Sequence, residues 1–313
     1  MTPHPHRILT TDLRYPEGPV WLADGSVIVV EVRGGTLTRV HPDGRKQLVA
    51  EPGGGPNGIA VGADGYLYVC NNGGLAWVER AGMILPHGVP ADYRGGRIER
   101  IDPSTGKVEL LYDQVNGVPL KGPNDIVCDA HGGFWFTDFG KVRERDADRG
   151  GLYYAKCDGS LVREVVYPLV TPNGVGLSPD GRNVYVAETD SARLWAWSIG
   201  APGEIKPEAW PASPNGGRLL YASPDYVRFD SLGVEADGNI CVGTLVKGGI
   251  SVVSPQGGLV EFIAVGGEIF PTNLCFGGPG MKKAYITCSG RGELAELDWP
   301  RAGATLYNKV RGG

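Results

Sequence analysis

One strand–turn–strand unit recurs six times along the chain, and this repetition limits the possible folds more than any other feature of the sequence. The clearest copy is TPNGVGLSPDGRNVYVAE at residues 171–188, where two apolar segments flank a Pro-Asp-Gly turn. In each copy an acidic or amide residue stands seven places before the turn position. These six residues, called the entrance residues below, are Glu17, Asn57, Asn124, Asn173, Asp230 and, in a copy with a poorer turn, Asn273.

The spacing of the repeats is typical of propeller blades. Successive entrance residues are separated by 40, 67, 49, 57 and 43 residues, which fits blades that carry loop insertions. A second pair of extended segments follows each copy, for example residues 36–40 and 96–101, and no long helical period appears. We therefore predict an all-β fold, a six-bladed β-propeller with four-stranded antiparallel blades, forming a single domain over residues 1–313.

The two ends of the chain together supply the material of one blade. Asn273 is followed by 40 residues and Glu17 is preceded by 16. We expect residues 7–13 to form the last strand of the blade that residues 291–297 continue. Such pairing closes the ring and removes an exposed sheet edge.

Composition excludes several classes of function. The chain has 313 residues and a net charge of -5, and its basic residues form no run that could track a phosphate backbone, so we expect no nucleic-acid partner. No apolar window is long enough to span a membrane, and residues 1–6 lack the apolar region of a signal peptide, so a cytoplasmic protein is expected. The six cysteines have no C-x-x-C spacing, which favours reduced thiols over zinc ligands. Oligomeric state stays open.

The entrance residues should converge at one mouth of the central channel, because each begins an innermost strand. All six carry carboxylate or amide oxygens. Any one of them could simply cap backbone groups beside a turn, but six together in a narrow channel are costly unless something coordinates them. An oxygen-only set suits a hard divalent cation, with calcium expected first and magnesium or manganese next.

Four segments carry a resemblance to a known family. Residues 15–21 (YPEGPVW), 123–125 (PND), 172–174 (PNG) and 229–231 (FDS) resemble the metal-binding segments of the senescence-marker-protein/regucalcin/gluconolactonase family, six-bladed propeller lactonases related to diisopropyl fluorophosphatase. The similarity extends over nearly the whole chain. It implies one divalent ion, usually calcium, held by Glu17, Asn124, Asn173 and Asp230. The stretch 124–139 is closest to the drug-responsive lactonase branch, in which the serine matching Ser231 also touches the metal.

The same resemblance implies a metal-dependent hydrolase that opens a lactone. We expect the metal to polarise the carbonyl, Asp230 to activate water, and Asp125 to be the reserve base. Because a carboxylate bound to a divalent cation is a weak base, Asp230 could instead orient a water that the metal acidifies. The sequence has no G-x-S-x-G motif, so a serine nucleophile is not expected. Asp138, at a predicted strand end, is expected to cap backbone groups.

Substrate contacts are expected from Ser231 and from the remaining entrance residues, Asn57 and Asn273, the last two of which could instead brace the ring. The second repeat carries the largest insertion, residues 71–94, and its Trp77 and Tyr93 would suit a lid over an apolar lactone. The alternative is that these rings pack the insertion onto its own blade.

The residue two places before Asn124 bears on the choice of lactone. Family members that act on sugar lactones often carry an arginine there, and this chain has Gly122. We therefore expect a hydrophobic or aromatic lactone rather than a sugar lactone. The alternatives are a sugar-acid lactonase, an aryl-esterase or organophosphate hydrolase at the same site, and a non-enzymatic propeller that binds calcium or protein partners.

Overall fold

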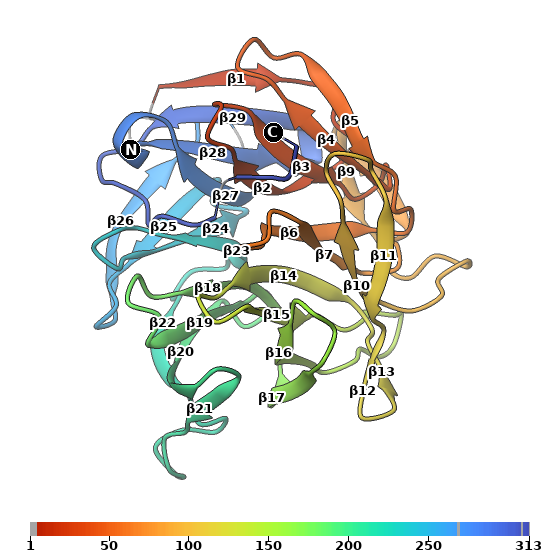
Figure 1. The fold of residues 1–313 in the computed structure, drawn as a ribbon. Helices are drawn as coiled ribbons and strands as arrows, with labels where there is room; N and C mark the ends of the chain where they lie inside the picture. The colour runs from red at the N-terminus through yellow and green to blue at the C-terminus, as the bar shows by residue number, and fades with distance from the viewer. Residues whose placement is uncertain (1–4, 268–269, 308, 313) are drawn as a thin grey trace.

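The chain folds into six antiparallel sheets arranged around a central axis, so the predicted six-bladed propeller is confirmed (Figure 1). The computed structural model describes residues 5–267, 270–307 and 309–312. Blade 1 is β2 (Pro16–Trp21), β3 (Val27–Glu31), β4 (Thr36–Val40) and β5 (Lys46–Ala50), and blade 2 is β6 (Pro56–Val61), β7 (Leu67–Asn71), β10 (Arg97–Ile101) and β11 (Val108–Tyr112). Blade 3 is β14 (Pro123–Cys128), β15 (Gly133–Asp138), β16 (Gly150–Lys156) and β17 (Val162–Leu169).

The other three blades follow the same plan. Blade 4 is β18 (Pro172–Leu177), β19 (Asn183–Glu188), β20 (Arg193–Ala201) and β21 (Glu204–Lys206), with β22 (Arg218–Ala222) also paired to β20. Blade 5 is β23 (Arg228–Val234), β24 (Ile240–Leu245), β25 (Gly249–Val253) and β26 (Leu259–Ala264). Blade 6 is β27 (Pro271–Gly277), β28 (Lys283–Cys288), β29 (Glu293–Asp298) and β1 (His6–Thr10). Two small hairpins, β8 (Trp77–Arg80) with β9 (Met83–Pro86) and β12 (Gln114–Val115) with β13 (Val118–Pro119), lie outside the blades.

The first strand closes the ring as predicted. It pairs antiparallel with β29, with His6 opposite Leu297 and Ile8 opposite Ala295. The innermost strands β2, β6, β14, β18, β23 and β27 contact one another in that order, and β27 returns to β2. The channel is therefore enclosed by six strands that each begin at the same end.

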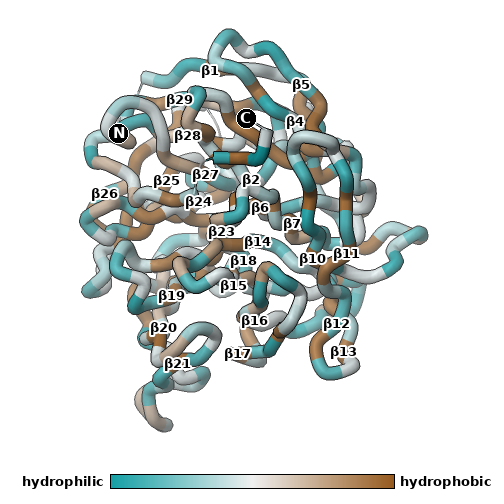
Figure 2. The backbone as a smooth tube through the Cα atoms, viewed as in Figure 1, coloured by the Kyte–Doolittle hydropathy of each residue, from teal (hydrophilic) through white to brown (hydrophobic). Residues whose placement is uncertain are grey.

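The hydrophobic core lies between the blades. Among the described residues the buried apolar side chains form six clusters, and each cluster joins two adjacent blades. Val30 of blade 1 packs with Ile59 of blade 2, for example, and Trp135 of blade 3 packs with Trp197 of blade 4. The strands supply these residues because alternate side chains point to opposite faces of each sheet. Figure 2 shows the corresponding hydrophobic stretches along the strands.

The C-terminal segment runs from blade 5 to blade 2. Trp299 Nε1 donates to Glu235 Oε1 at 2.7 Å, and Arg301 Nε donates to the second oxygen of the same carboxylate at 2.6 Å. Farther along, the Ala304 N–H bonds Val234 O at 2.9 Å, and the Arg311 N–H bonds Gly65 O at 3.0 Å. This segment therefore passes the channel between two blades that are not neighbours in the ring.

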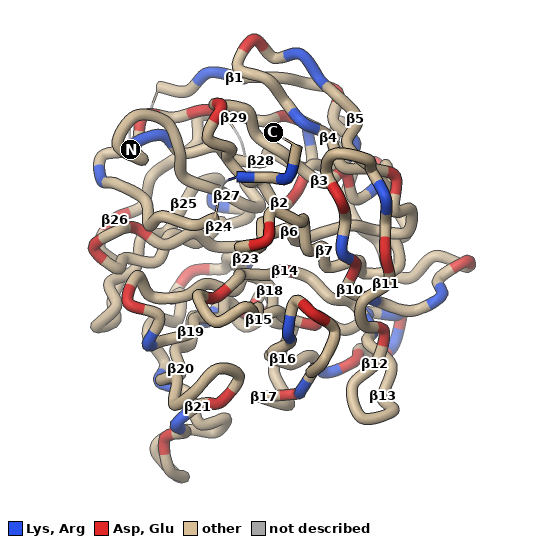
Figure 3. Tube along the Cα trace, viewed as in Figure 1, with Lys and Arg blue, Asp and Glu red and all other residues tan. Residues whose placement is uncertain are grey.

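Charged residues of both signs are mixed along the chain (Figure 3). Within the described ranges, no helix has the length and apolar character needed to cross a bilayer. No disulfide bond joins any of the six cysteines, all of which lie in the described ranges.

Candidate functional site

Each innermost strand is irregular where its entrance residue stands. The register against the second strand shifts between Glu17 and Val20 in β2, and β6, β14, β18, β23 and β27 shift at the matching place. A β-bulge bends a strand and re-aims a side chain that would otherwise face the next sheet. The irregularity thus frees the entrance residues from the regular alternation of the blade.

Glycines after the entrance residues let the innermost strands approach closely. A Cβ on Gly58 would lie 2.5 Å from Asn124 O, and a Cβ on Gly174 would lie 2.8 Å from Asp230 O. Both distances are too short for a real side chain. The small residue after one entrance residue therefore sets the position of the next blade's entrance residue.

The structure brings five of the six entrance residues together. Glu17, Asn57, Asn124, Asn173 and Asp230, from five different blades, line one pocket, called the mouth pocket below. Its wall also contains Arg228, Lys141 and several apolar residues. These residues are far apart in the sequence, and only the closed ring places them at a common point.

Asn273 lies at a different level of the channel. In four blades a proline directly precedes the entrance residue, but in β27 Thr272 stands between Pro271 and Asn273. Thr272 is buried and its hydroxyl bonds that of Thr287 at 2.9 Å. Asn273 therefore lies one residue deeper and donates from Nδ2 to Glu17 Oε2 at 3.1 Å. It holds the Glu17 carboxylate through this hydrogen bond and does not line the mouth pocket.

Glu17 is a buried carboxylate held by amide donors. Its Oε2 accepts the Gly18 N–H at 2.9 Å in addition to the Asn273 bond. Burial raises the pKa of the Glu17 carboxyl above its usual value, and hydrogen bonds from Thr272, Gly18 and Asn273 oppose that rise. The charged form therefore needs a compensating positive charge nearby.

Asp230 is a second buried carboxylate with a raised pKa in the same pocket. Burial raises the pKa of Asp230 well above its ordinary value, and the negative charge of Glu17 raises it further, while a hydrogen bond from Asn173 opposes the rise. Asn173 is itself fixed, because its Nδ2 donates to Thr189 Oγ1 at 3.1 Å and its Oδ1 accepts from Ser231 Oγ at 3.2 Å. Two buried carboxylates thus repel each other across one pocket.

This donor set fits a hard divalent cation. A doubly charged ion between Glu17 and Asp230 would neutralise both carboxylates, and amide oxygens would complete its coordination without adding charge. The side chains of Asn57 and Asn124 make no hydrogen bond with any described residue and face the pocket. Within the described part of the chain, no group of three or more His, Cys, Asp or Glu is placed to hold a metal, so a cation in this pocket would also have to use the amide oxygens.

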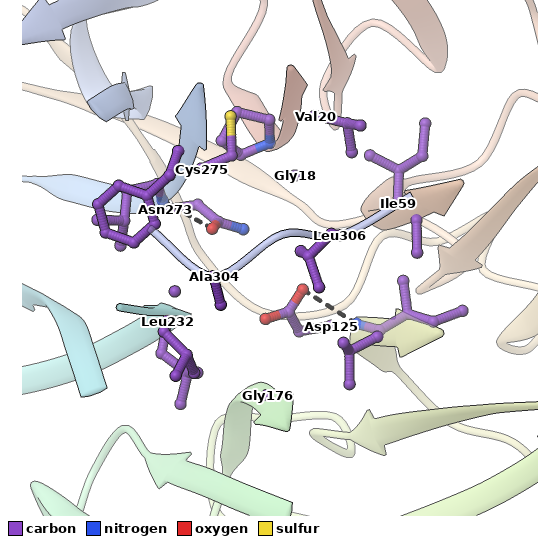
Figure 4. Close-up of a pocket in the computed structure, with 18 of the residues that line it drawn as sticks. Gly18, Val20, Ile59, Asp125, Gly176, Leu232, Asn273, Cys275, Ala304 and Leu306 are labelled. Carbon is purple, nitrogen blue, oxygen red and sulfur yellow. Dashed lines mark hydrogen bonds between the residues drawn. The ribbon is translucent and has the colours of Figure 1, made fainter. Parts of the chain in front are cut away.

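Asp125 faces away from this pocket. It lines a second, mainly apolar space, the channel cavity, together with Asn273, Ile59, Leu232 and Leu306 (Figure 4). Its Oδ1 accepts the Ile126 N–H at 3.0 Å and its Oδ2 accepts the Val175 N–H of the next blade at 3.2 Å. Burial raises the pKa of Asp125 to about 7. The entrance residues therefore separate a polar mouth from an apolar interior.

Residues 15–290 match the model of the SMP-30/Gluconolactonase/LRE-like region. The chain belongs to this family.

Individual relatives agree with this assignment. A gluconolactonase from Zymomonas mobilis is 24% identical over 308 residues, covering 91% of this chain and 79% of that protein. Diisopropyl-fluorophosphatase from Loligo vulgaris is 26% identical and covers 96% of this chain and 93% of its own. The calcium-binding protein regucalcin from Agrobacterium tumefaciens has the same fold, with a TM-score of 0.76, 18% identity, and coverage of 98% and 97%.

Gly122 in this family member lies where no side chain fits. A Cβ there would stand 2.5 Å from Gly140 O, and the Phe139 N–H bonds Gly122 O at 2.9 Å. Asp138 secures the same turn, since its carboxylate accepts the N–H groups of Lys121, Gly122 and Gly140 at 2.7, 2.7 and 2.8 Å. The predicted capping role of Asp138 is confirmed.

The insertion at 71–94 forms part of the pocket wall. Asn72, Leu75, Leu85 and Pro86 line the mouth pocket. The tip of the β8–β9 hairpin reaches blade 6, where Met83 lies 3.4 Å from the position of a Cβ on Gly290.

The two aromatic rings predicted to cover the substrate do not line the pocket. Trp77 packs on Tyr15, with ring centroids 4.8 Å apart, and joins the apolar cluster between blades 1 and 2. The Tyr93 hydroxyl donates to Lys121 O at 2.6 Å. Both rings therefore fix the insertion against the propeller body.

Lys141 and Phe139 were missed. They lie in the loop between β15 and β16 (residues 139–149), which is longer than the matching loop of most other blades, so repeat spacing gave no signal for them.

Proposed function

We propose that this protein hydrolyses a lactone at a divalent cation, calcium first, held by Glu17, Asn124, Asn173 and Asp230. The observation that carries the proposal is the buried, mutually repelling pair Glu17 and Asp230 among amide oxygens in one pocket. Membership of the family, a gluconolactonase relative and a calcium-binding structural relative support it.

The chemistry needs an electrophile and a positioned water. A divalent cation bound in the pocket would withdraw electron density from the lactone carbonyl and stabilise the negative charge that develops on its oxygen. In this proposal Asp230 holds the attacking water and accepts its proton as the oxygen–carbon bond forms. Cleavage of the ring C–O bond then releases the alkoxide oxygen, which takes up a proton to give a hydroxy acid.

The neighbouring residues keep Asp230 and the amides in place. Ser231 bonds the Asn173 carbonyl oxygen, and in this proposal it orients that oxygen toward the cation. Asp125 lies in the channel cavity and ties β14 to β18 through the Val175 N–H, so we assign it the positioning of Asn124 rather than contact with substrate. Asn57, whose side chain is unengaged among the described residues, is available to contact the substrate.

The pocket wall favours an apolar ring over a sugar. Leu75, Leu85, Pro86 and Phe139 present hydrocarbon surface to the pocket, and Gly122 presents no side chain that could bond a hydroxyl group. We therefore propose a lactone with a hydrophobic or aromatic ring. A phosphorus ester is the second candidate, because diisopropyl-fluorophosphatase is a relative over nearly the full chain.

The test is a pH-stat screen of aliphatic, aromatic and sugar lactones, with aryl esters and phosphotriesters as comparison substrates. Protein stripped with a chelator should lose turnover, and calcium should restore it. The Glu17→Gln variant should need far higher calcium for the same rate, while Glu51→Gln, at an exposed position outside the site, should behave as the wild type. Full turnover after complete removal of metal would refute the proposal, and preference for phosphotriesters would replace it with the second candidate.

A further inference from the structure

The mouth pocket contains one positive charge that no acidic side chain neutralises. The charged residues among its described lining are Glu17, Asp230, Arg228 and Lys141. Arg228 forms an ion pair with Asp190 at 2.7 Å. Lys141 forms no ion pair with any described residue, although its exposed fraction is only 3%.

The contacts of the Lys141 ammonium are few. Its Nζ donates to Gly74 O at 2.8 Å and lies 4.8 Å from the centre of the Tyr93 ring. A protonated amine has three N–H donors, and among the described residues only Gly74 O accepts one of them. Burial lowers the pKa of Lys141 to about 8, with partial compensation from the charges of Asp138 and Asp148.

The two carboxylates whose charges act on Lys141 are occupied elsewhere. Asp138 accepts three backbone N–H groups, and Asp148 binds the Arg143 guanidinium through both oxygens at 3.0 Å. A buried ammonium without a paired anion is costly, and a partner that arrives with the substrate would remove that cost.

The backbone around Lys141 is held rigidly next to the strand that carries Asn124. The preceding residue, Gly140, is packed against Gly122, as described above. The Lys141 N–H bonds Asp148 Oδ2 at 3.1 Å, its carbonyl accepts the Asp148 N–H at 3.0 Å, and Val142 bridges to Ala147. A fixed loop therefore supplies a cation to the same pocket that receives the carboxylate and amide oxygens.

We propose that Lys141 binds a carboxylate substituent of the substrate, so that the preferred lactones carry a carboxylate on the ring. This inference rests on the proposed lactone hydrolysis and specifies its substrate class. A divalent ion between Glu17 and Asp230 would bring the charge of those three groups to zero, which leaves Lys141 as the group that selects for an anion. In this scheme Lys141 binds the substrate through its carboxylate, while the reacting carbonyl meets the entrance residues.

Binding of two matched probes tests the inference separately from hydrolysis. Cyclopentanone-3-carboxylate and cyclopentanone-3-carboxamide have the ring shape of a lactone but no ester to cleave, and they differ in charge. We would titrate each into the calcium-loaded wild type and the Lys141→Met, Lys141→Arg and Lys121→Met variants, and follow binding by NMR. Lys121 is an exposed lysine close to the same loop and is the matched control.

The wild type and Lys121→Met should bind the carboxylate at least about 10-fold more tightly than the carboxamide, as expected for a charge-assisted hydrogen bond. Lys141→Met should abolish this preference while binding the carboxamide within about 2-fold of the wild type, and Lys141→Arg should retain most of it. Equal loss for both probes would make Lys141 only a tether to Gly74. A preference that survives in Lys141→Met, or is absent from the wild type, would also overturn the inference.

Hydrolysis of the corresponding lactones, measured in parallel, separates the two proposals. Lys141-dependent carboxylate binding without any turnover would sink the lactonase proposal and leave the anion site standing. Turnover of neutral and carboxylate lactones at equal kcat/KM in every variant would overturn the anion site and leave the lactonase proposal standing.

Discussion

The charge of Asp230, rather than its size, should determine turnover. Asp230→Asn keeps the shape of the side chain and an oxygen that can still point to a cation, but it removes the group that accepts the proton of water. We predict a fall in kcat of roughly 10²–10⁴-fold, the usual contribution of a general base. Turnover should be measured by pH-stat beside the metal content of the same sample.

The matched control for this prediction is Asp237→Asn, in the exposed turn of the same blade. It should leave kcat and calcium content unchanged. If Asp230→Asn keeps its metal and turns over at the wild-type rate, Asp230 takes no part in the reaction.

At the scale of single residues, what the sequence could predict depended on periodicity. Counting back from each turn identified the five residues that meet in the mouth pocket, because the blades repeat and the ring is closed. In the sixth copy one extra residue, Thr272, separates the proline from Asn273. The irregular turn that follows is displaced by the same one residue relative to the proline. Lys141 comes from an extended loop and Leu85 from the β8–β9 hairpin, neither of which follows the repeat, so their positions depend on tertiary packing that no spacing encodes.

The glycines of the innermost strands determine how closely adjacent innermost strands approach one another. A methyl group on Gly58 would stand 2.5 Å from Asn124 O, so β6 and β14 would have to separate. We predict that Gly58→Ala destabilises the protein by about 1–3 kcal/mol, as overpacking of a core does, and also weakens calcium binding because Asn124 moves. Urea unfolding and calcium titration would measure the two effects.

Gly200→Ala provides the comparison for this variant. Gly200 lies in an outer blade strand, where a Cβ would be 3.4 Å from the flexible Lys206 side chain. It should change neither stability nor calcium affinity appreciably. Normal calcium binding by Gly58→Ala would show that the strand spacing does not set the site.

The strands themselves were predictable, whereas the role of the long insertion was predicted only in part. Alternating apolar residues and turn motifs specify each blade, and the same pattern indicated that residues 71–94 interrupt blade 2. The aromatic rings of that insertion face the propeller body instead of the pocket. Trp77 packs on Tyr15, where its ring is partly buried, instead of facing the open mouth.

The stability of the closed propeller depends on the pairing of β1 with β29. β1 is the outer strand of blade 6. Its Leu9 packs with Leu294 of blade 6, with Val27 of blade 1 and with Leu13, which lies in the segment between the two blades. Removal of residues 1–10 would expose the edge of β29 and open an apolar cluster between the first and last blades. A loss of at least about 3 kcal/mol is expected from the buried leucine alone.

We predict that this truncation lowers Tm by on the order of 10 °C and promotes association through the exposed edge. Differential scanning calorimetry and size-exclusion chromatography would record both changes. A shorter truncation that removes residues 1–5 leaves β1 intact and is the control.

The full-length chain should unfold in a single transition if residues 1–313 form one domain, because each apolar cluster ties one blade to the next. Two separate transitions, or an unchanged Tm after removal of β1, would show that the blades do not stabilise one another around the ring.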